Sequence, residues 1–143
     1  MVVFEGKSTG RVAVARLMRG SDLLQGIQSL AEKVGFRAAT VQFIGALGKA
    51  VVQILDQDTK QYISHAVPGP VEVVSGTGNV SQKDGVPFAH VHVALAGLDG
   101  KCVGGHVGSG TEVYLIELVL SELSTEPPLD RKPDAEIGVA VWK

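Results

Sequence analysis

The sequence contains a single cysteine, Cys102, among its 143 residues, so no disulfide can form within the chain. It also lacks a run of about 18 apolar residues, the length that a membrane-spanning helix requires. Residues 1–7 do not contain the apolar segment of a secretory signal peptide. These absences predict a cytoplasmic protein that does not associate with a membrane.

The chain also has little net charge and few aromatic residues. Its 13 lysines and arginines are balanced by 15 aspartates and glutamates, which leaves a net charge of −2, and aromatic residues make up only 5% of the chain. Proteins that hold nucleic acid by electrostatics need many lysine and arginine contacts to phosphate. The charge therefore makes DNA an unlikely partner.

What the chain does contain is typical of one globular domain over residues 1–143. Hydrophobic residues make up 45% of the sequence and charged residues 20%, and 143 residues are enough to bury a core. The 18 glycines suit a fold with many short strands and tight turns.

Only one segment has the pattern of a helix. Apolar residues recur at helical spacing from Leu23 to Val34. Ser21 is a suitable N-cap, and Asp22 has the charge that favours a helix N-terminus. Gly35 suits the position just after the last helical residue.

The rest of the chain is predicted to form strands in an α+β fold, an antiparallel or mixed β-sheet with one main helix packed on one side. A break is expected at Pro68-Gly69-Pro70, and residues 124–135, which contain three prolines, are expected to be irregular. The expected strands are residues 11–18, 39–47, 50–55, 61–66, 71–80, the strand around His90, its hairpin partner, 112–120 and 137–141.

Three of the four histidines lie within seventeen residues, in a region that resembles a β-hairpin. Side chains two apart in a strand project from the same face, so His90 and His92 are neighbours on one surface. His106 follows on the next predicted strand. Three imidazoles on one face can bind a divalent metal such as zinc and leave coordination positions open for water or a ligand.

Whether His106 joins this face depends on the turn at Asp99-Gly100, a strong hairpin signal. A strict two-residue loop would place His106 on the opposite face from His92. One additional residue, from a three-residue loop or a bulge at Gly104-Gly105, would place His106 opposite Ala94 and on the correct face. The metal site requires this second arrangement.

Simpler interpretations of these residues stay open. A His-x-His in a strand is often a pair of ordinary half-buried or solvated imidazoles, and His65, which has no histidine near it in sequence, is expected to be a surface or interface residue. Alternation favours a solvated Glu72, although a carboxylate beside a metal-bound water could serve as a general base. Arg16 and Arg19 could bind an anion or simply extend to the surface.

Several segments together resemble the PPC (plant and prokaryote conserved) domain. They are RLMRGSDL at residues 16–23, VQFIGAL at 41–47, VEVVSGTGNV at 71–80, HVHVALA at 90–96 and DGKCVGGHV at 99–107. They follow the order of the family and cover roughly residues 10–123, which leaves residues 124–143 as a C-terminal extension. No Arg-Gly-Arg-Pro core of an AT-hook is present, so the resemblance is to the stand-alone prokaryotic type.

The resemblance implies a compact α+β fold with an antiparallel sheet, assembled as a homotrimer. It also implicates the positions of His90, His92 and His106 in metal binding, with zinc as the expected metal. Prokaryotic members are often labelled DNA-binding by analogy with the plant proteins, and such an analogy is a weak basis for function. A trimer has separate support, because the apolar strands, such as residues 51–55, exceed what one helix can cover.

Three functions are compatible with these observations. The first is a trimeric, zinc-binding domain whose three-histidine site binds a small ligand or whose surface binds a protein partner. The second is a zinc-dependent hydrolase of a small ester-like substrate, with Glu72 or a carboxylate of a neighbouring subunit as the base. The third is DNA binding. Whether the protein is an enzyme stays open at this point.

Overall fold

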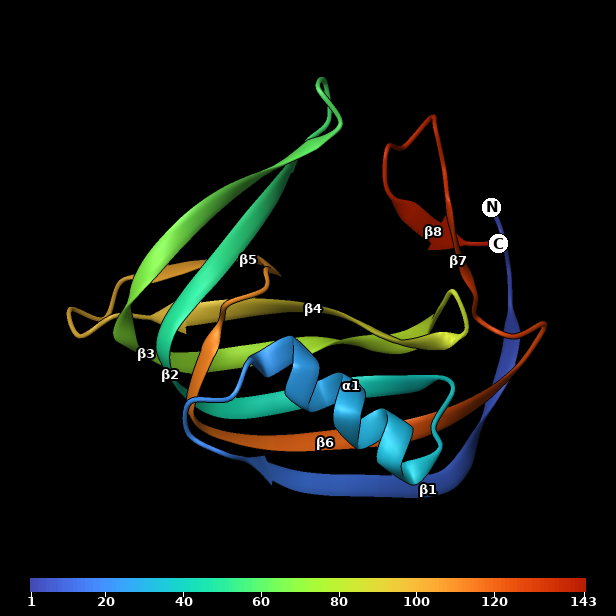
Figure 1. The fold of residues 1–143 in the computed structure, drawn as a ribbon, viewed down its shortest axis with the longest axis horizontal. Helices are drawn as coiled ribbons and strands as arrows, with labels where there is room; N and C mark the ends of the chain where they lie inside the picture. Colours follow the sequence, from blue (N-terminus) through green and yellow to red (C-terminus); the bar gives the residue numbers. More distant parts are fainter.

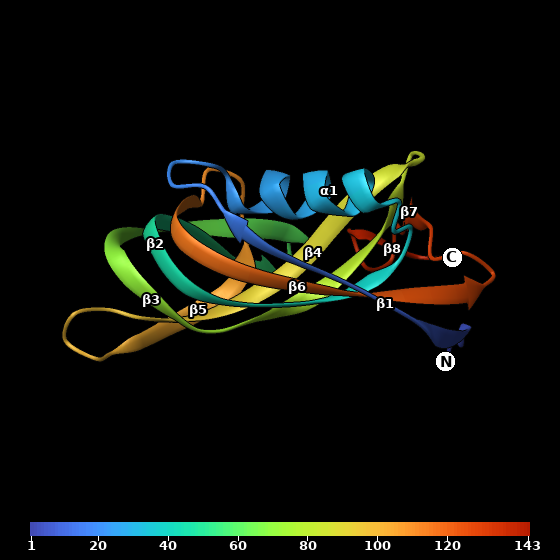
Figure 2. The same ribbon diagram turned by 90° about the horizontal axis from the view of Figure 1, so that it is seen from below.

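A curved, six-stranded antiparallel β-sheet with one helix across its face forms most of the computed structural model, which describes residues 1–143 (Figures 1 and 2). The strand order is β1-β6-β2-β3-β4-β5, and β7 and β8 form a separate two-stranded ladder. This confirms the predicted α+β class. The elements are β1 (Glu5–Leu17), α1 (Leu23–Val34), β2 (Ala39–Asp56), β3 (Gln61–Lys83), β4 (Val86–Ala96), β5 (Cys102–Val107), β6 (Glu112–Glu126), β7 (Arg131–Pro133) and β8 (Ala140–Trp142).

The helix α1 lies where the sequence predicts it, but its N-cap is Asp22 rather than Ser21. Asp22 has an extended backbone, and its Oδ1 accepts a hydrogen bond from the Gln25 amide at 3.0 Å. The Ser21 hydroxyl instead donates to the Met18 carbonyl. Gly35 ends the helix with φ at 74°, the left-handed conformation that glycine adopts without strain. At twelve residues, this helix is too short to cross a membrane.

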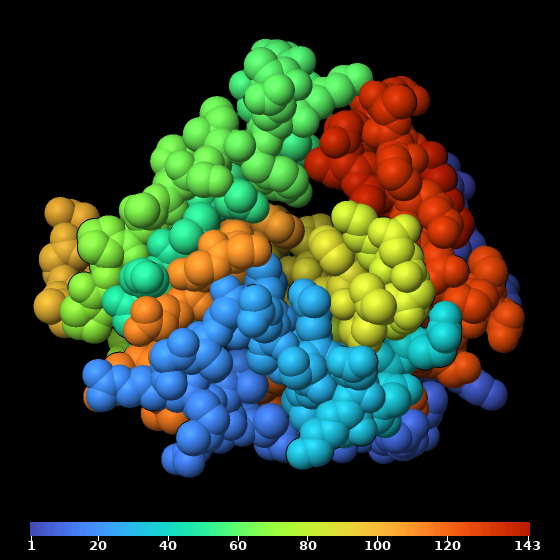
Figure 3. Space-filling model, in the orientation of Figure 1, coloured from blue at the N-terminus to red at the C-terminus, as the bar shows by residue number.

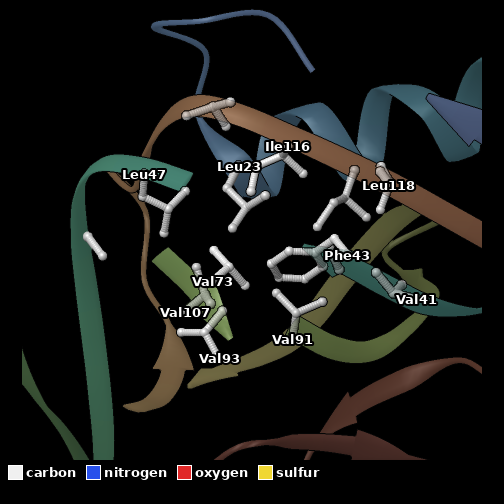
Figure 4. Packing of buried hydrophobic residues seen from close by; sticks show 14 of the residues in the cluster. Leu23, Val41, Phe43, Leu47, Val73, Val91, Val93, Val107, Ile116 and Leu118 are labelled. Carbon is white, nitrogen blue, oxygen red and sulfur yellow. The ribbon is translucent and has the colours of Figure 1, made fainter. Parts of the chain in front are cut away.

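The hydrophobic core lies between α1 and one face of the sheet (Figure 4). In β4 the buried residues alternate: Ala89, Val91, Val93 and Leu95 all face the core. The residues between them, which include the first two histidines of the cluster, therefore face away from it. Other core members are Leu23, Ile27, Val41, Phe43, Leu47, Val73, Val107, Ile116 and Leu118.

The predicted break at residues 68–70 is wrong, because β2 and β3 form one long hairpin through that region. Leu47 pairs with Val71, and Lys49 pairs with Pro68. One residue of β2 therefore lies opposite residues 69–70 of β3, and the ladder continues on both sides of this irregularity. A Cβ on Gly69 would lie 1.9 Å from the Gly48 carbonyl oxygen, so only glycine permits this close approach. Beyond it the outer half of the hairpin turns away from the rest of the sheet (Figure 1) and β2 pairs with β5.

The C-terminal extension is more ordered than the sequence predicts. Strand β6 continues to Glu126, and the last strand is β8 at residues 140–142, rather than 137–141, paired with the short β7. The tip of the β2–β3 hairpin and the extension face each other in the space-filling view (Figure 3). Lys60 Nζ at that tip donates to the Ala135 carbonyl at 3.0 Å. The extension is thereby connected to both the sheet and the hairpin.

Candidate metal centre

The register of β4 and β5 brings the third histidine to the other two. His106 pairs directly with His92, and Ala96 pairs with Cys102, with no bulge between them. The predicted pairing of His106 with Ala94 is therefore wrong, although the predicted face is correct. The connecting loop comprises residues 97–101, between the end of β4 and the start of β5, and the Gly97 amide donates to the Lys101 carbonyl across it at 3.0 Å.

The three histidines form one cluster on the face of the sheet opposite the core. Their candidate ligand nitrogens all lie within 4.8 Å of one another. The Nε2 atoms of His90 and His92 are 3.3 Å apart. The ring centroids of His90 and His106 are 4.9 Å apart. His65 is exposed and lies outside this cluster, as expected.

Burial keeps two of the three imidazoles neutral. Together with the smaller effects of Arg131, His106 and His92, burial, the largest cause, lowers the pKa of His90 to about 4. Burial is also the main cause of the lowered pKa of His106, followed by His92 and Arg131. Because a metal binds the deprotonated ring, these shifts favour metal binding over protonation near neutral pH.

Arg131, from the C-terminal extension, is hydrogen-bonded to the cluster. Its side chain is buried, with 7% of its surface exposed. A guanidinium only donates, so the 3.1 Å contact between Arg131 Nη2 and His90 Nδ1 makes that ring nitrogen the acceptor. The same guanidinium donates to Asn79 Oδ1 at 3.0 Å and to Ser81 Oγ at 2.9 Å, so β3 fixes its position.

Tyr62 contacts the third histidine of the cluster. Its ring stacks on His106 with centroids 5.0 Å apart and an angle of 24° between the planes. Tyr62 lies in the outer half of the long hairpin, and its strand neighbour β2 pairs with β5 at Gln53 and His106. The long β2–β3 hairpin therefore brings Tyr62 to the histidine cluster.

The cluster fits a tetrahedral metal ion in two respects. At a zinc–nitrogen distance of about 2.0–2.1 Å, two tetrahedral ligands are about 3.3–3.4 Å apart. The separation of the His90 and His92 Nε2 atoms, 3.3 Å, matches this value. In addition, His106 Nδ1 is buried without any hydrogen-bond partner. An unpaired buried nitrogen is costly, and metal coordination would satisfy it.

The other candidate residues lie outside the cluster. Glu72 is exposed and pairs with Ala96, which is four residues, or about 13 Å, along β4 from His92. This placement agrees with the solvated interpretation, and the catalytic role of Glu72 stays a prediction. Arg16 and Arg19 are both exposed, and the Arg19 guanidinium lies over the Tyr114 ring, 4.7 Å from its centroid.

The sequence gives no signal for Arg131 or Tyr62. Arg131 lies in a proline-containing stretch with no periodic pattern. Tyr62 reaches His106 only because the long hairpin bends. Both contacts arise from tertiary structure between segments far apart in the chain.

The fold and the cluster together define a small antiparallel-sheet domain with a three-histidine centre and one covering helix. The chain belongs to the Plants and Prokaryotes Conserved domain family, which it matches over residues 4–124. This confirms the resemblance inferred from its segments.

Two solved structures are similar to this chain over its whole length. One is a metal-containing protein from Archaeoglobus fulgidus, with 39% identity, a TM-score of 0.92 and coverage of 100% of this chain and 99% of that protein. The other is a plant- and prokaryote-conserved protein from Pyrococcus horikoshii, with 35% identity, a TM-score of 0.89 and coverage of 100% and 97%.

A curated relative, the bifunctional protein GlmU of Synechococcus sp. (strain JA-3-3Ab), is 32% identical over 130 residues. That match covers 90% of this chain but 20% of the relative. The chain therefore spans about a fifth of the length of that curated protein.

Proposed function

We propose that this chain is a trimeric domain that holds one divalent metal ion through His90, His92 and His106 and presents it to a small ligand. The observation that carries the proposal is the convergence of three imidazoles, among them one with an unpaired, buried nitrogen. The metal-containing relative from Archaeoglobus fulgidus supports the same conclusion.

Zinc is the metal that we propose, because three neutral imidazoles suit its coordination and leave a position open. Nickel and copper also bind imidazole well, so the donor set alone does not select between them. A bound zinc ion would act as a Lewis acid at its open position. In the metal-free protein the chain's own residues orient the histidines: Arg131 donates to His90, and Tyr62 stacks on His106.

Hydrolysis is less well supported than ligand binding. A hydrolase requires a base within hydrogen-bond reach of the attacking water. No carboxylate belongs to the cluster, and Glu72 lies on an exposed part of β3. DNA binding is also less well supported, because the net charge is −2.

Zinc titration of chelator-treated protein tests this proposal. We expect one binding event per chain in the wild type and its loss in His92→Ala. His92 is exposed and faces away from the core, so this variant should fold normally. His65→Ala removes an exposed histidine outside the cluster and should bind zinc like the wild type. Equal zinc affinity in His92→Ala and the wild type would contradict the proposal.

A further inference from the structure

The charged side chain that contacts the histidine cluster is cationic: Arg131 is hydrogen-bonded to His90. The cluster itself contains three histidines and no carboxylate. A divalent ion bound by neutral imidazoles would keep its full charge, and the Arg131 guanidinium would add another beside it. An excess of buried positive charge is costly unless an anion accompanies it.

The hydrogen bond between Arg131 and His90 cannot persist once His90 binds a metal. If the metal takes Nδ1, it uses the lone pair that now accepts from Arg131 at 3.1 Å. If the metal takes Nε2, the proton of the neutral ring resides on Nδ1, and two donors then face each other. In either case one N–H of the buried Arg131 guanidinium loses its hydrogen-bond acceptor. This loss is unfavourable unless another acceptor takes the place of His90.

A cavity beside His90 offers room for a new hydrogen-bond acceptor for Arg131. It has a volume of about 300 Å³ and is lined by Asn79, His90, Arg131, Val141 and Trp142. The Trp142 indole N–H is buried and has no hydrogen-bond partner. The cavity is therefore lined by the cationic Arg131 and by a tryptophan whose N–H is unpaired, and no acidic side chain lines it.

We propose that the site binds a small oxyanion, such as a carboxylate, together with the metal, and that Arg131 is the residue that recognises it. This inference rests on the proposed metal site. An oxyanion offsets the positive charge and accepts the N–H that His90 releases. The Arg131 guanidinium keeps its hydrogen bonds to Ser81, Asn79 and the Ala140 carbonyl, so it stays in place while the released N–H forms a charge-assisted hydrogen bond with the anion. Anion and metal should each strengthen the binding of the other, since coupling between two ligands is reciprocal.

The single tryptophan provides the measurement, because Trp142 lines the cavity itself. Sodium acetate and sodium sulfate are titrated into zinc-loaded and metal-free protein, with sodium chloride holding the ionic strength constant. We expect a saturable fluorescence change in zinc-loaded protein and at least about tenfold weaker binding without zinc. A response to acetate alone would identify a carboxylate site, and a response to both salts a general oxyanion site.

Variants of two neighbouring residues separate recognition from a general charge effect. Arg131→Gln should weaken anion binding by about 10- to 100-fold, the loss expected for a charge-assisted hydrogen bond. Lys132→Gln removes an adjacent, exposed positive charge and should bind the anion like the wild type. If Arg131→Gln does not fold, Arg131→Lys keeps the charge but lacks the planar fork, and it should also bind the anion more weakly.

Failure of this inference differs from failure of the metal site. Zinc binding without any response to acetate or sulfate would overturn the oxyanion inference and leave the metal site intact. Equal anion affinity in Arg131→Gln, Lys132→Gln and the wild type would also overturn it. If the wild type binds no zinc, the proposed function is wrong, and the oxyanion inference falls with it.

Discussion

At the scale of single residues, His90 is the most constrained member of the site. Its Nδ1 accepts from Arg131, and its Nε2 lies 3.3 Å from the Nε2 of His92. Because the ring is also partly buried beside positive groups, its charged form is disfavoured and its pKa falls to about 4. The neutral ring is ready to bind a metal, but metal binding must break its hydrogen bond with Arg131.

This pKa predicts how the stability of the metal-free protein depends on pH. In the unfolded chain a histidine has a pKa of about 6.5, whereas folded His90 has a pKa of about 4. Between these values the unfolded state binds a proton that the folded state does not. The free energy of unfolding should therefore fall as pH decreases from about 6.5 to about 4. His106, whose pKa is shifted in the same direction, adds to this fall.

Urea denaturation of chelator-treated protein at a series of pH values measures this dependence. In His90→Gln, the new amide oxygen can still accept from Arg131 but no longer titrates. We expect this variant to lose less stability over the same pH range than the wild type. Identical pH dependence in the two proteins would show that His90 is not held neutral by the fold.

At the scale of elements, the two strands under the cluster must approach closely. Gly78 in β3 pairs with Val91 in β4, and a Cβ at this position would lie 2.1 Å from the His90 carbonyl oxygen. The contact is to backbone, so a side chain cannot be accommodated by a rotamer change. Gly78 therefore keeps the histidine strand in its place in the sheet.

Gly78→Ala should consequently destabilise the protein and weaken zinc binding. Overpacking of this kind costs about 1–3 kcal/mol or more, and thermal denaturation with and without zinc would measure the loss. Gly97→Ala is the matched control in the β4–β5 loop, where a Cβ would lie 3.2 Å from the Asp99 Oδ1 atom and 4.0 Å from the Lys101 carbonyl oxygen. A Gly78→Ala variant as stable as Gly97→Ala would contradict this account of the strand pair.

The elements also show which features the sequence could predict. Alternation along β4 is enough to place His90 and His92 on one face. For His106, a shift of the β4–β5 register by two residues leaves the side chain on the same face, whereas a shift by one moves it to the other. The predicted pairing of His106 with Ala94 is wrong because residues 97–101 form a five-residue loop, in which the Gly97 amide donates to the Lys101 carbonyl. The role of Arg131 could not be predicted, since it depends on contacts between the extension and β3.

At the scale of the whole molecule, the sheet exposes apolar side chains that a single chain leaves uncovered. Ile44 and Val74 are each 57% exposed and line the same groove, which has a volume of about 540 Å³. Exposed apolar patches of this kind commonly mark protein interfaces. The proposed homotrimer would cover them, because the helix already occupies the opposite face.

Light scattering coupled to size-exclusion chromatography tests this assembly. We expect the mass of a trimer for the wild type and a shift towards monomer in Ile44→Glu, where a charge would be buried at the interface. Val86→Glu, at a residue that is 59% exposed and lies outside the groove, should remain a trimer. A monomeric wild type at micromolar concentration would rule out the proposed trimer.

Elemental analysis of untagged protein, purified without a metal column, tests the central claim most directly. The account predicts about one zinc per chain in the wild type and in His65→Ala, and none in the His90→Ala/His92→Ala variant. Absence of metal from the wild type, or equal metal content in the double variant, would contradict the assignment of His90, His92 and His106 as a metal centre.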